Sequence, residues 1–295
     1  MANLIELVKE LRDKTGAGFA DCKKALEATG EDLEKAIDWL REKGIAKDAS
    51  KGSRIAAEGL AQVVVNGNKC VMVEVNSETD FTARNEKFKE LVDTVANTIA
   101  NGNATTIDEA LALPTANGTL SEVIANVSFT TGEKMTLRRF EVINKTDDQV
   151  FGTYLHFDGK KACVVTLNGA NQEVAQNIAM QVVSMNPTYV DRDHMPTEIV
   201  AHETEVQTQI VKNDPSNATK PENIIAKMVE GKVSKALKEM CLVDQDYILD
   251  GNQKVSGYLK ANNMSVVDFY RYGVGEGIEK KVDNWVEEVQ AALNK

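Results

Sequence analysis

The amino-acid sequence predicts an α+β protein assembled from several small modules. A chain of 295 residues is long enough to divide into more than one hydrophobic core. Apolar residues recur at helical spacing near the N-terminus, and two apolar runs that contain hairpin turns are each followed by a helical stripe. We therefore expect a three-helix bundle, a duplicated core of antiparallel sheet and helix, a projecting helical hairpin and a C-terminal helix.

The first module is a short helical bundle. Leu4, Leu7, Val8 and Leu11 form the first helical stripe. A glycine turn at residues 15–18 precedes a second helix, and Asp32 is an N-cap candidate for a third. The glycine turn and Trp39-Leu40 resemble ubiquitin-associated domains, which favours a docking module. Packing of the bundle on its own chain is the open alternative, because so small a core gains from a neighbour.

The distribution of charged residues along the chain indicates where this module ends. Residues 1–54 hold 11 Lys and Arg against 11 Asp and Glu, so the remaining 23 and 34 account for the whole net charge of −11. Residues 47–54 lose apolar periodicity and are predicted to be a linker. The predicted division is 1–54 for the docking bundle and linker, 55–143 for the first core sub-domain, 144–265 for the second with a helical hairpin at about 197–240, and 266–295 for a C-terminal module.

A hairpin followed by a helix occurs twice. Residues 60–65 and 69–75 flank the turn Asn66-Gly67, and a helical stripe begins at Phe88. Residues 153–157 and 162–167 flank the turn Asp158-Gly159, and a stripe begins at Val174. Two copies indicate a duplication rather than a solenoid.

The remaining elements complete the architecture. Residues 135–142 predict an added strand in which Arg138-Arg139 marks a bulge, and residues 266–272 predict another strand. Two apolar stripes, at 199–210 and 224–237, predict antiparallel helices joined by a polar loop with two prolines. A last stripe begins at Ile278 and Val282 and predicts the C-terminal helix.

Composition excludes several classes of function. An excess of acidic residues, 45 against 34 basic, disfavours direct nucleic-acid binding. We expect no membrane segment and a cytoplasmic location, because no apolar run reaches about 18–20 residues and the N-terminus lacks a secretory stretch. Four widely spaced cysteines predict neither structural zinc nor disulfides. No catalytic residue, metal site or cofactor is predicted.

Three weaker patterns are candidates for a phosphate-binding loop, a metal site and a nucleophile. Residues 273–277 follow a strand and precede a helix like a phosphate loop, but their GxGxG spacing fits a flexible joint better. His194 and His202 are better interpreted as surface histidines than as metal ligands. Cys22 lies beside Lys23 and Lys24, yet no histidine partner supports a nucleophile.

The most distinctive segment is the loop at residues 76–85, where Asp80 and Phe81 are adjacent. In one interpretation Thr79 or Asp80 caps the helix that contains Phe88, while Phe81 packs back toward Phe88 as a staple. In the other, Phe81 is an exposed aromatic wedge beside an acid, presented to a partner.

Several motifs occur in one order along nearly the whole chain. They are LRDKTGAGFADCKKAL at residues 11–26, EVNSETDF at 74–81, and shorter matches at 177–180, 227–231 and 273–280. This series resembles the elongation factor Ts family, the guanine-nucleotide exchange factors of translation elongation factor Tu. Residues 100–131 carry no such motif.

The resemblance implies that the protein binds elongation factor Tu·GDP, displaces magnesium and promotes GDP release so that GTP can rebind. It implies a wedge of Thr79, Asp80, Phe81 and Thr82, of which Thr82 is the weaker flank because many relatives carry Val there. The docking contacts that it implies are Thr15, Gly16, Gly18, Asp21, Cys22, Lys23, Ile278 and Val282. A peptide-docking adaptor and an enzyme of unknown reaction are kept as alternatives. A homodimer through the helical hairpin and a 2:2 complex with the partner are both left open.

Overall fold

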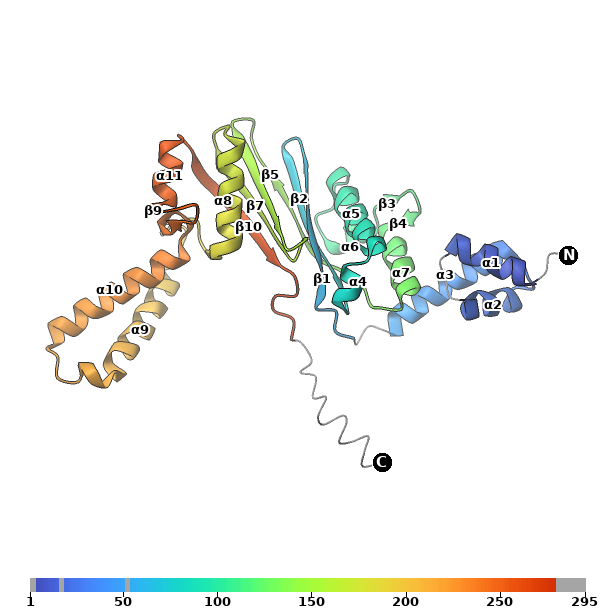
Figure 1. Ribbon diagram of the computed structural model, residues 1–295, viewed down its shortest axis with the longest axis horizontal. Helices are drawn as coiled ribbons and strands as arrows, with labels where there is room; N and C mark the ends of the chain where they lie inside the picture. Colours follow the sequence, from blue (N-terminus) through green and yellow to red (C-terminus); the bar gives the residue numbers. More distant parts are fainter. Residues whose placement is uncertain (1–3, 16–18, 51–53, 280–295) are drawn as a thin grey trace, which may run out of the picture.

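The computed structural model describes residues 4–15, 19–50 and 54–279. The described chain is elongated, with a helical bundle at one end, two sheets in the middle and a helical hairpin at the other end (Figure 1). The α+β architecture agrees with the sequence prediction.

The N-terminal bundle consists of α1 (Leu4–Thr15), α2 (Phe19–Ala28) and α3 (Leu33–Ser50). Its core is formed by Val8, Leu11, Cys22, Ala25, Leu26, Ala36 and Leu40. The predicted N-cap is confirmed, because the Lys35 N–H donates to Asp32 Oδ1 over 3.1 Å. The predicted linker is wrong over residues 47–50, which continue α3. Once a helix has formed, it can extend by further turns that carry no apolar stripe. Residues 47–50 contain no proline that would end α3.

The first core sub-domain contains an antiparallel sheet in the order β1-β2-β5. Its strands are β1 (Glu58–Asn66), β2 (Lys69–Ser77) and β5 (Thr136–Asn144). Its helices are α4 (Asp80–Ala83), α5 (Glu86–Asn101), α6 (Ile107–Leu111) and α7 (Leu120–Thr131). The predicted bulge is confirmed: Glu74 pairs with Arg139 and Val75 with Leu137, which leaves Arg138 as the extra residue.

Residues 100–131, which carry no family motif, hold several elements that the sequence analysis missed. They contain α6, α7 and a two-residue hairpin of β3 (Pro114–Thr115) and β4 (Gly118–Thr119). Both helices begin with a capping box, Thr106 with Glu109 and Thr119 with Glu122. The spacing Thr-x-x-Glu was therefore the pattern that could have located them.

The second sub-domain repeats this plan in the order β10-β7-β6. Its strands are β6 (Gln149–His156), β7 (Lys161–Asn168) and β10 (Ser265–Gly273), and α8 (Gln172–Met185) follows the hairpin. A short hairpin of β8 (Asp246–Tyr247) and β9 (Asp250–Lys254) precedes α11 (Val255–Ala261). The sequence division placed residues 266–273 in a C-terminal module, but β10 pairs with β7 and completes the second sheet.

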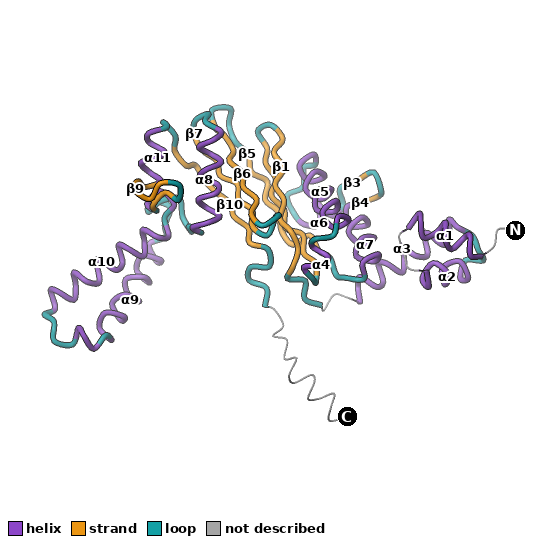
Figure 2. Tube along the Cα trace, in the orientation of Figure 1, coloured by secondary structure: helices purple, strands orange, loops and turns teal. Residues whose placement is uncertain are grey.

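The two sheets pack face to face, and helices cover their outer faces (Figure 2). Met72 and Ile143 of the first sheet meet Val164 and Tyr272 of the second in the layer between them. Phe88 lies in the core between the first sheet and its helices, and Ile178 lies in the corresponding core of the second. In each unit the central strand is the second strand of the hairpin, which supports the predicted duplication.

The predicted helical hairpin is confirmed. It consists of α9 (Thr197–Asn213) and α10 (Glu222–Met240), and it projects from the second sub-domain (Figure 1). A 3₁₀ turn (Pro215–Asn217) forms its tip, where Asn217 Nδ2 donates to the Val211 carbonyl over 2.9 Å. The predicted C-terminal helix lies outside the described residues from residue 280 onward.

Candidate partner-binding site

The wedge segment, Thr79–Thr82, lies where β2 ends and α4 begins. Thr79 caps α4, because its Oγ1 accepts a hydrogen bond from the Thr82 N–H over 3.3 Å. Phe81 is 81% exposed, whereas Phe88 is fully buried in the first core. The staple interpretation is wrong in both parts. Thr79 caps the short helix α4, whereas the helix that contains Phe88, α5, is capped by Asn85, and Phe81 points into solvent. Phe81 has the highest exposed fraction among the large apolar side chains of the described residues, and aromatic side chains are typical binding anchors.

Asp80 lies beside this ring on the same turn. Its carboxylate pairs with Arg84 over 3.0 Å, and both side chains are exposed. Surface pairs of this kind contribute only about 0–1 kcal/mol, so Asp80 exchanges this partner for another at small cost. Thr82 is half-buried against the same turn. The segment therefore presents an aromatic ring and a carboxylate together.

Glu133 anchors the start of the wedge segment through hydrogen bonds. The sequence analysis did not identify this residue. Glu133 Oε2 accepts from the backbone N–H groups of Glu78 and Thr79, each over 3.1 Å, and Oε1 accepts from Thr79 Oγ1 over 2.6 Å. The Glu78 carboxylate in turn accepts from the Lys134 N–H over 2.5 Å and pairs with Arg54 over 3.2 Å. Charge-assisted bonds of this kind fix the backbone that carries Asp80 and Phe81.

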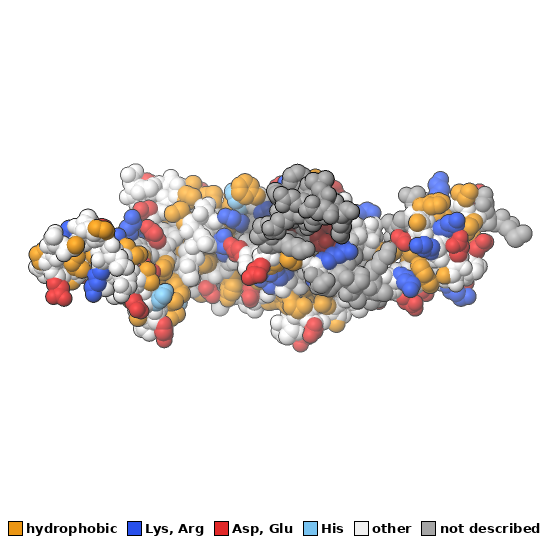
Figure 3. All heavy atoms as spheres, turned by 90° about the horizontal axis from the view of Figure 1, so that it is seen from below, with side chains coloured by type: hydrophobic (Ala, Val, Ile, Leu, Met, Phe, Trp, Pro, Cys, Tyr) orange, Lys and Arg blue, Asp and Glu red, His pale blue; other side chains and the backbone are white. Residues whose placement is uncertain are grey.

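The candidate docking residues of the N-terminal bundle are placed differently from one another. Lys23 is exposed and pairs with Glu27 over 3.7 Å, while Thr15 and Asp21 are half-buried. Cys22 is fully buried in the bundle core rather than on its surface. Gly16 and Gly18 lie outside the described residues. Figure 3 shows Lys and Arg interspersed with Asp and Glu over this bundle, in agreement with its net charge of zero.

The C-terminal candidates begin just after β10. Ile278 is half-buried, and its N–H donates to the Gly275 carbonyl over 3.1 Å; Val282 lies outside the described residues. The Gly275 N–H donates to Glu74 Oε1 over 2.8 Å, and the Gly273 N–H to Glu276 Oε2 over 3.1 Å. Carboxylates already occupy amides that a phosphate would need, so the phosphate-loop interpretation is wrong. The interpretation as a flexible joint is also wrong, because Gly275 is bonded to Glu74 on β2 and Gly273 is bonded to Glu276 within the loop.

Glu74 is ionised although it is buried. Burial raises the pKa of its carboxyl, whereas the Gly275 N–H and the guanidinium groups of Arg138 and Arg139 lower it, and the net shift of the pKa is downward. This carboxylate therefore remains a full acceptor at neutral pH.

Groups that could support catalysis or metal binding are used elsewhere or lie apart. His194 pairs with Asp191, with 2.6 Å between Nδ1 and Oδ1. Burial raises the pKa of Cys70 to about 12, which leaves that thiol protonated. The part of the chain that the structure describes contains no group of three His, Cys, Asp or Glu residues placed to hold a metal ion.

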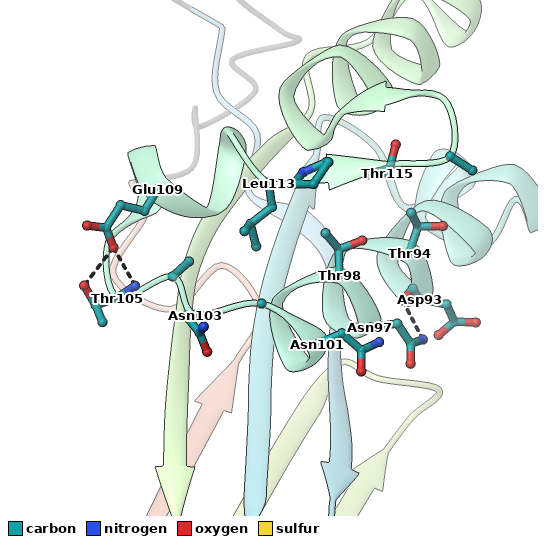
Figure 4. Close-up of a pocket in the computed structure, with 14 residues that line it drawn as sticks. Asp93, Thr94, Asn97, Thr98, Asn101, Asn103, Thr105, Glu109, Leu113 and Thr115 are labelled. Carbon is teal, nitrogen blue, oxygen red and sulfur yellow. Dashed lines mark hydrogen bonds between the residues drawn. The ribbon is translucent and has the colours of Figure 1, made fainter.

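A hollow of about 1050 Å³ lies beside α5, α6 and β3 (Figure 4). Its two acids already serve local structure: Glu109 accepts from the N–H and Oγ1 of Thr105, both over 2.8 Å, and Asp93 accepts from Gln62 Nε2 over 2.6 Å. Neutral polar side chains, including Asn97, Asn101 and Thr115, make up much of the remaining wall. This lining provides no catalytic pair. Over residues 4–15, 19–50 and 54–279, no helix combines the length and apolar character required to span a bilayer.

Comparison with known proteins gives a uniform result. The family model described as "Elongation factor TS" matches residues 78–276, and the model described as "Elongation factor Ts, mitochondrial, N-terminal" matches residues 2–48. Among curated relatives, a protein named elongation factor Ts from Levilactobacillus brevis is 50% identical over 97% of both chains. One of the same name from Spiroplasma citri is 46% identical over 98% of both, and one from Lactiplantibacillus plantarum is 48% identical over 96% of this chain and 95% of its own.

Proposed function

Because the chain belongs to the elongation factor Ts family, whose members act in translation elongation, we propose that it is the guanine-nucleotide exchange factor of elongation factor Tu. It binds the GDP-bound partner, displaces magnesium and promotes GDP release so that GTP can rebind. The observation that carries this proposal is the exposed pair of Asp80 and Phe81 at a turn held by a charged scaffold.

The proposed chemistry requires no proton transfer by this protein. A GTPase holds its nucleotide through phosphate contacts with backbone amides and through magnesium. The Phe81 ring enters the partner beside the metal site and separates elements that hold the magnesium. The Asp80 carboxylate accompanies it and contributes negative charge beside the cation. Binding is reciprocal: if this protein weakens GDP binding by some factor, GDP weakens its binding by the same factor.

Rigid presentation supports the wedge proposal. Glu133 binds the backbone of Glu78 and Thr79, so little conformational entropy is lost when the wedge segment enters the partner. Thr79 contributes through this anchor and through its cap on α4, and Thr82 through the turn itself.

Further partner contacts are proposed in the N-terminal bundle and just beyond β10. In the N-terminal bundle we assign docking to Thr15, Asp21 and Lys23, while Cys22 packs the bundle interior. Ile278 is assigned to the C-terminal contact. The helical hairpin exposes Ile210 and Ile224, which is compatible with a homodimer contact that stays a prediction.

The test is GDP release from purified elongation factor Tu loaded with a fluorescent GDP and chased with unlabelled GDP. We expect the wild-type protein to accelerate release strongly, and both Asp80→Ala and Phe81→Ala to lose most of that acceleration. Leu249→Ala, at an apolar position 57% exposed in the turn between β8 and β9, is the matched control and should behave as wild type. Binding without faster release would instead support an adaptor.

A further inference from the structure

The buried carboxylate of Glu74 binds the loop that follows β10. Glu74 lies on β2 with no solvent exposure. Its Oε1 accepts from the Gly275 N–H and from Arg138 Nη1, each over 2.8 Å, and its Oε2 accepts from Arg139 Nε over 2.6 Å. One side chain of the first sub-domain therefore holds a backbone amide that follows the last strand of the second.

The two arginines extend this contact to the carbonyl groups of the loop. Arg139 Nη2 donates to the Gly273 carbonyl over 3.2 Å, and Arg138 Nη2 donates to the Glu276 carbonyl. Arg139 also lies over the ring of Tyr272, at 4.0 Å from its centroid. We call Glu74, Arg138, Arg139 and their bonds to residues 273–276 the Glu74 tether.

The opposite side of the loop is also closely packed. Gly275 has a φ of +77°, and a Cβ at this position would collide with the carbonyl oxygen of Ala57. The Val274 N–H donates to the Lys160 carbonyl over 3.0 Å. The loop is therefore seated between the start of β1, the turn that joins β6 to β7, and the Glu74 tether.

The composition of the tether suggests a role beyond stability. Buried ion pairs contribute little net folding energy because desolvation offsets their attraction, yet they tolerate few alternative geometries. An apolar contact would permit the loop to slide. The Glu74 carboxylate instead accepts from four donors, the fourth being Asn76 Nδ2 over 3.2 Å, and so specifies the register of the loop. Glu74 is also close to the wedge segment along the chain, because β2 ends at Ser77 and the wedge segment begins at Thr79.

We propose that Glu74 is a positioning residue for partner binding. The tether fixes the point at which the chain leaves the core after β10 relative to the wedge segment, so that Ile278 and Phe81 meet one partner surface together. This inference rests on the exchange function proposed above. Glu74 itself touches neither nucleotide nor partner in this scheme.

The experiment compares full-length Glu74→Gln and Gly275→Ala with the wild type. Gln at position 74 keeps the side-chain shape and removes the charge, whereas Ala at position 275 displaces the loop and leaves the arginine pairs in place. Glu141→Gln, which neutralises an exposed carboxylate on β5, is the matched control. Hydrogen exchange of residues 273–278 is measured on the free protein, and affinity and GDP release are measured with elongation factor Tu.

Both tether variants should speed amide exchange in residues 273–278 by at least about tenfold while β1 and β2 stay protected. Affinity for the partner should fall by about tenfold, because a displaced loop must be reordered on binding. The rate of GDP release at saturating factor should stay within about twofold of wild type, because the wedge segment is intact. Glu141→Gln should change none of these quantities.

Two results would overturn the proposal: unchanged exchange of residues 273–278 in both variants, or faster exchange with unaltered affinity. If Glu74→Gln loses protection throughout β1 and β2, Gly275→Ala alone decides, because it leaves Glu74 and its arginines unchanged. Failure of the exchange function is a separate outcome. In that case the wild-type protein itself does not accelerate GDP release, while hydrogen exchange on the free protein still reports whether the tether holds the loop.

Discussion

Substitution of Phe81 by Ala separates folding from partner binding. The side chain is 81% exposed, so about a fifth of its roughly 200 Å² is buried. At about 25 cal/mol per Å², truncation costs about 1 kcal/mol of stability, which lowers the Tm by a few degrees at most. Phe88→Ala is the matched comparison, because that ring is fully buried. Its loss should cost about 3–5 kcal/mol.

For partner binding we expect the opposite ranking: Phe81→Ala should lose more affinity than Phe88→Ala, although it loses less stability. A central aromatic anchor contributes about 2–4 kcal/mol to an interface, which corresponds to a loss of roughly 30- to 1000-fold in affinity. Phe81→Ala should therefore unfold close to wild type by calorimetry, yet bind nucleotide-free elongation factor Tu far more weakly in a titration and release GDP slowly. Phe88→Ala should melt early, and its folded fraction should retain the wedge segment.

A single result refutes this reasoning: a Phe81→Ala protein with wild-type Tm that accelerates GDP release as fast as the wild type at every concentration. A large loss of Tm in Phe81→Ala would contradict the exposure of the ring and restore the staple interpretation.

Three further predictions follow from the described contacts. Glu133→Ala removes the acceptor for the backbone N–H groups of Glu78 and Thr79 and should slow GDP release about tenfold with a small change in Tm. Glu133→Gln should lose less, because the amide oxygen still accepts. Deletion of residues 1–51 should leave the core folded by circular dichroism, because each sub-domain has its own apolar core, but should weaken partner binding. Asp191 raises the pKa of His194 above 6.5, so the stabilisation from this pair is present below pH 6.5 and is lost as pH rises through the folded pKa of His194. The pKa of Asp191 is lowered, so the same stabilisation is also lost when pH falls through the folded pKa of Asp191. The Tm of His194→Ala should therefore lie below wild type near pH 5 and converge with it near pH 9, and equal differences at both values would exclude this linkage.

The sequence predicts the elements whose causes are local. The predicted turns locate two hairpins, although the first turn comprises Gly67 and Asn68 because Asn66 still pairs with Lys69. Alternation along residues 69–75 separates the residues that face α5 from those that face the second sheet. The bulge at Arg138 was predicted because two adjacent charges interrupt a strand pattern. Each of these inferences depends on residues within one or two turns of the chain.

The contacts that build the site depend on residues far apart in sequence. Glu133 meets Thr79 across 54 positions, and Glu74 meets Arg138 across 64 and Gly275 across 201. No local pattern distinguishes a carboxylate that will be buried from one that stays in solvent. The orientation of Phe81 could not be predicted for the same reason, because it depends on whether residues distant in sequence cover the ring.

The proposed exchange function requires more binding free energy than the wedge segment alone can supply. Weakening nucleotide binding by about 10⁴-fold requires roughly 5.5 kcal/mol of differential binding, and burial of one phenylalanine contributes about 2–3 kcal/mol. The remainder must come from contacts outside the wedge segment that form together with it. Separate contacts add their full free energy only if the surfaces that make them are already fixed relative to one another, because otherwise part of each is lost in ordering the protein. Glu133 and Glu74 meet this condition in the proposed complex. Glu133 fixes the turn that carries Phe81, just after β2, and Glu74, on β2, fixes the loop through which the chain continues beyond β10. The binding free energy can then act on the partner's nucleotide site instead of on reorganisation of this protein.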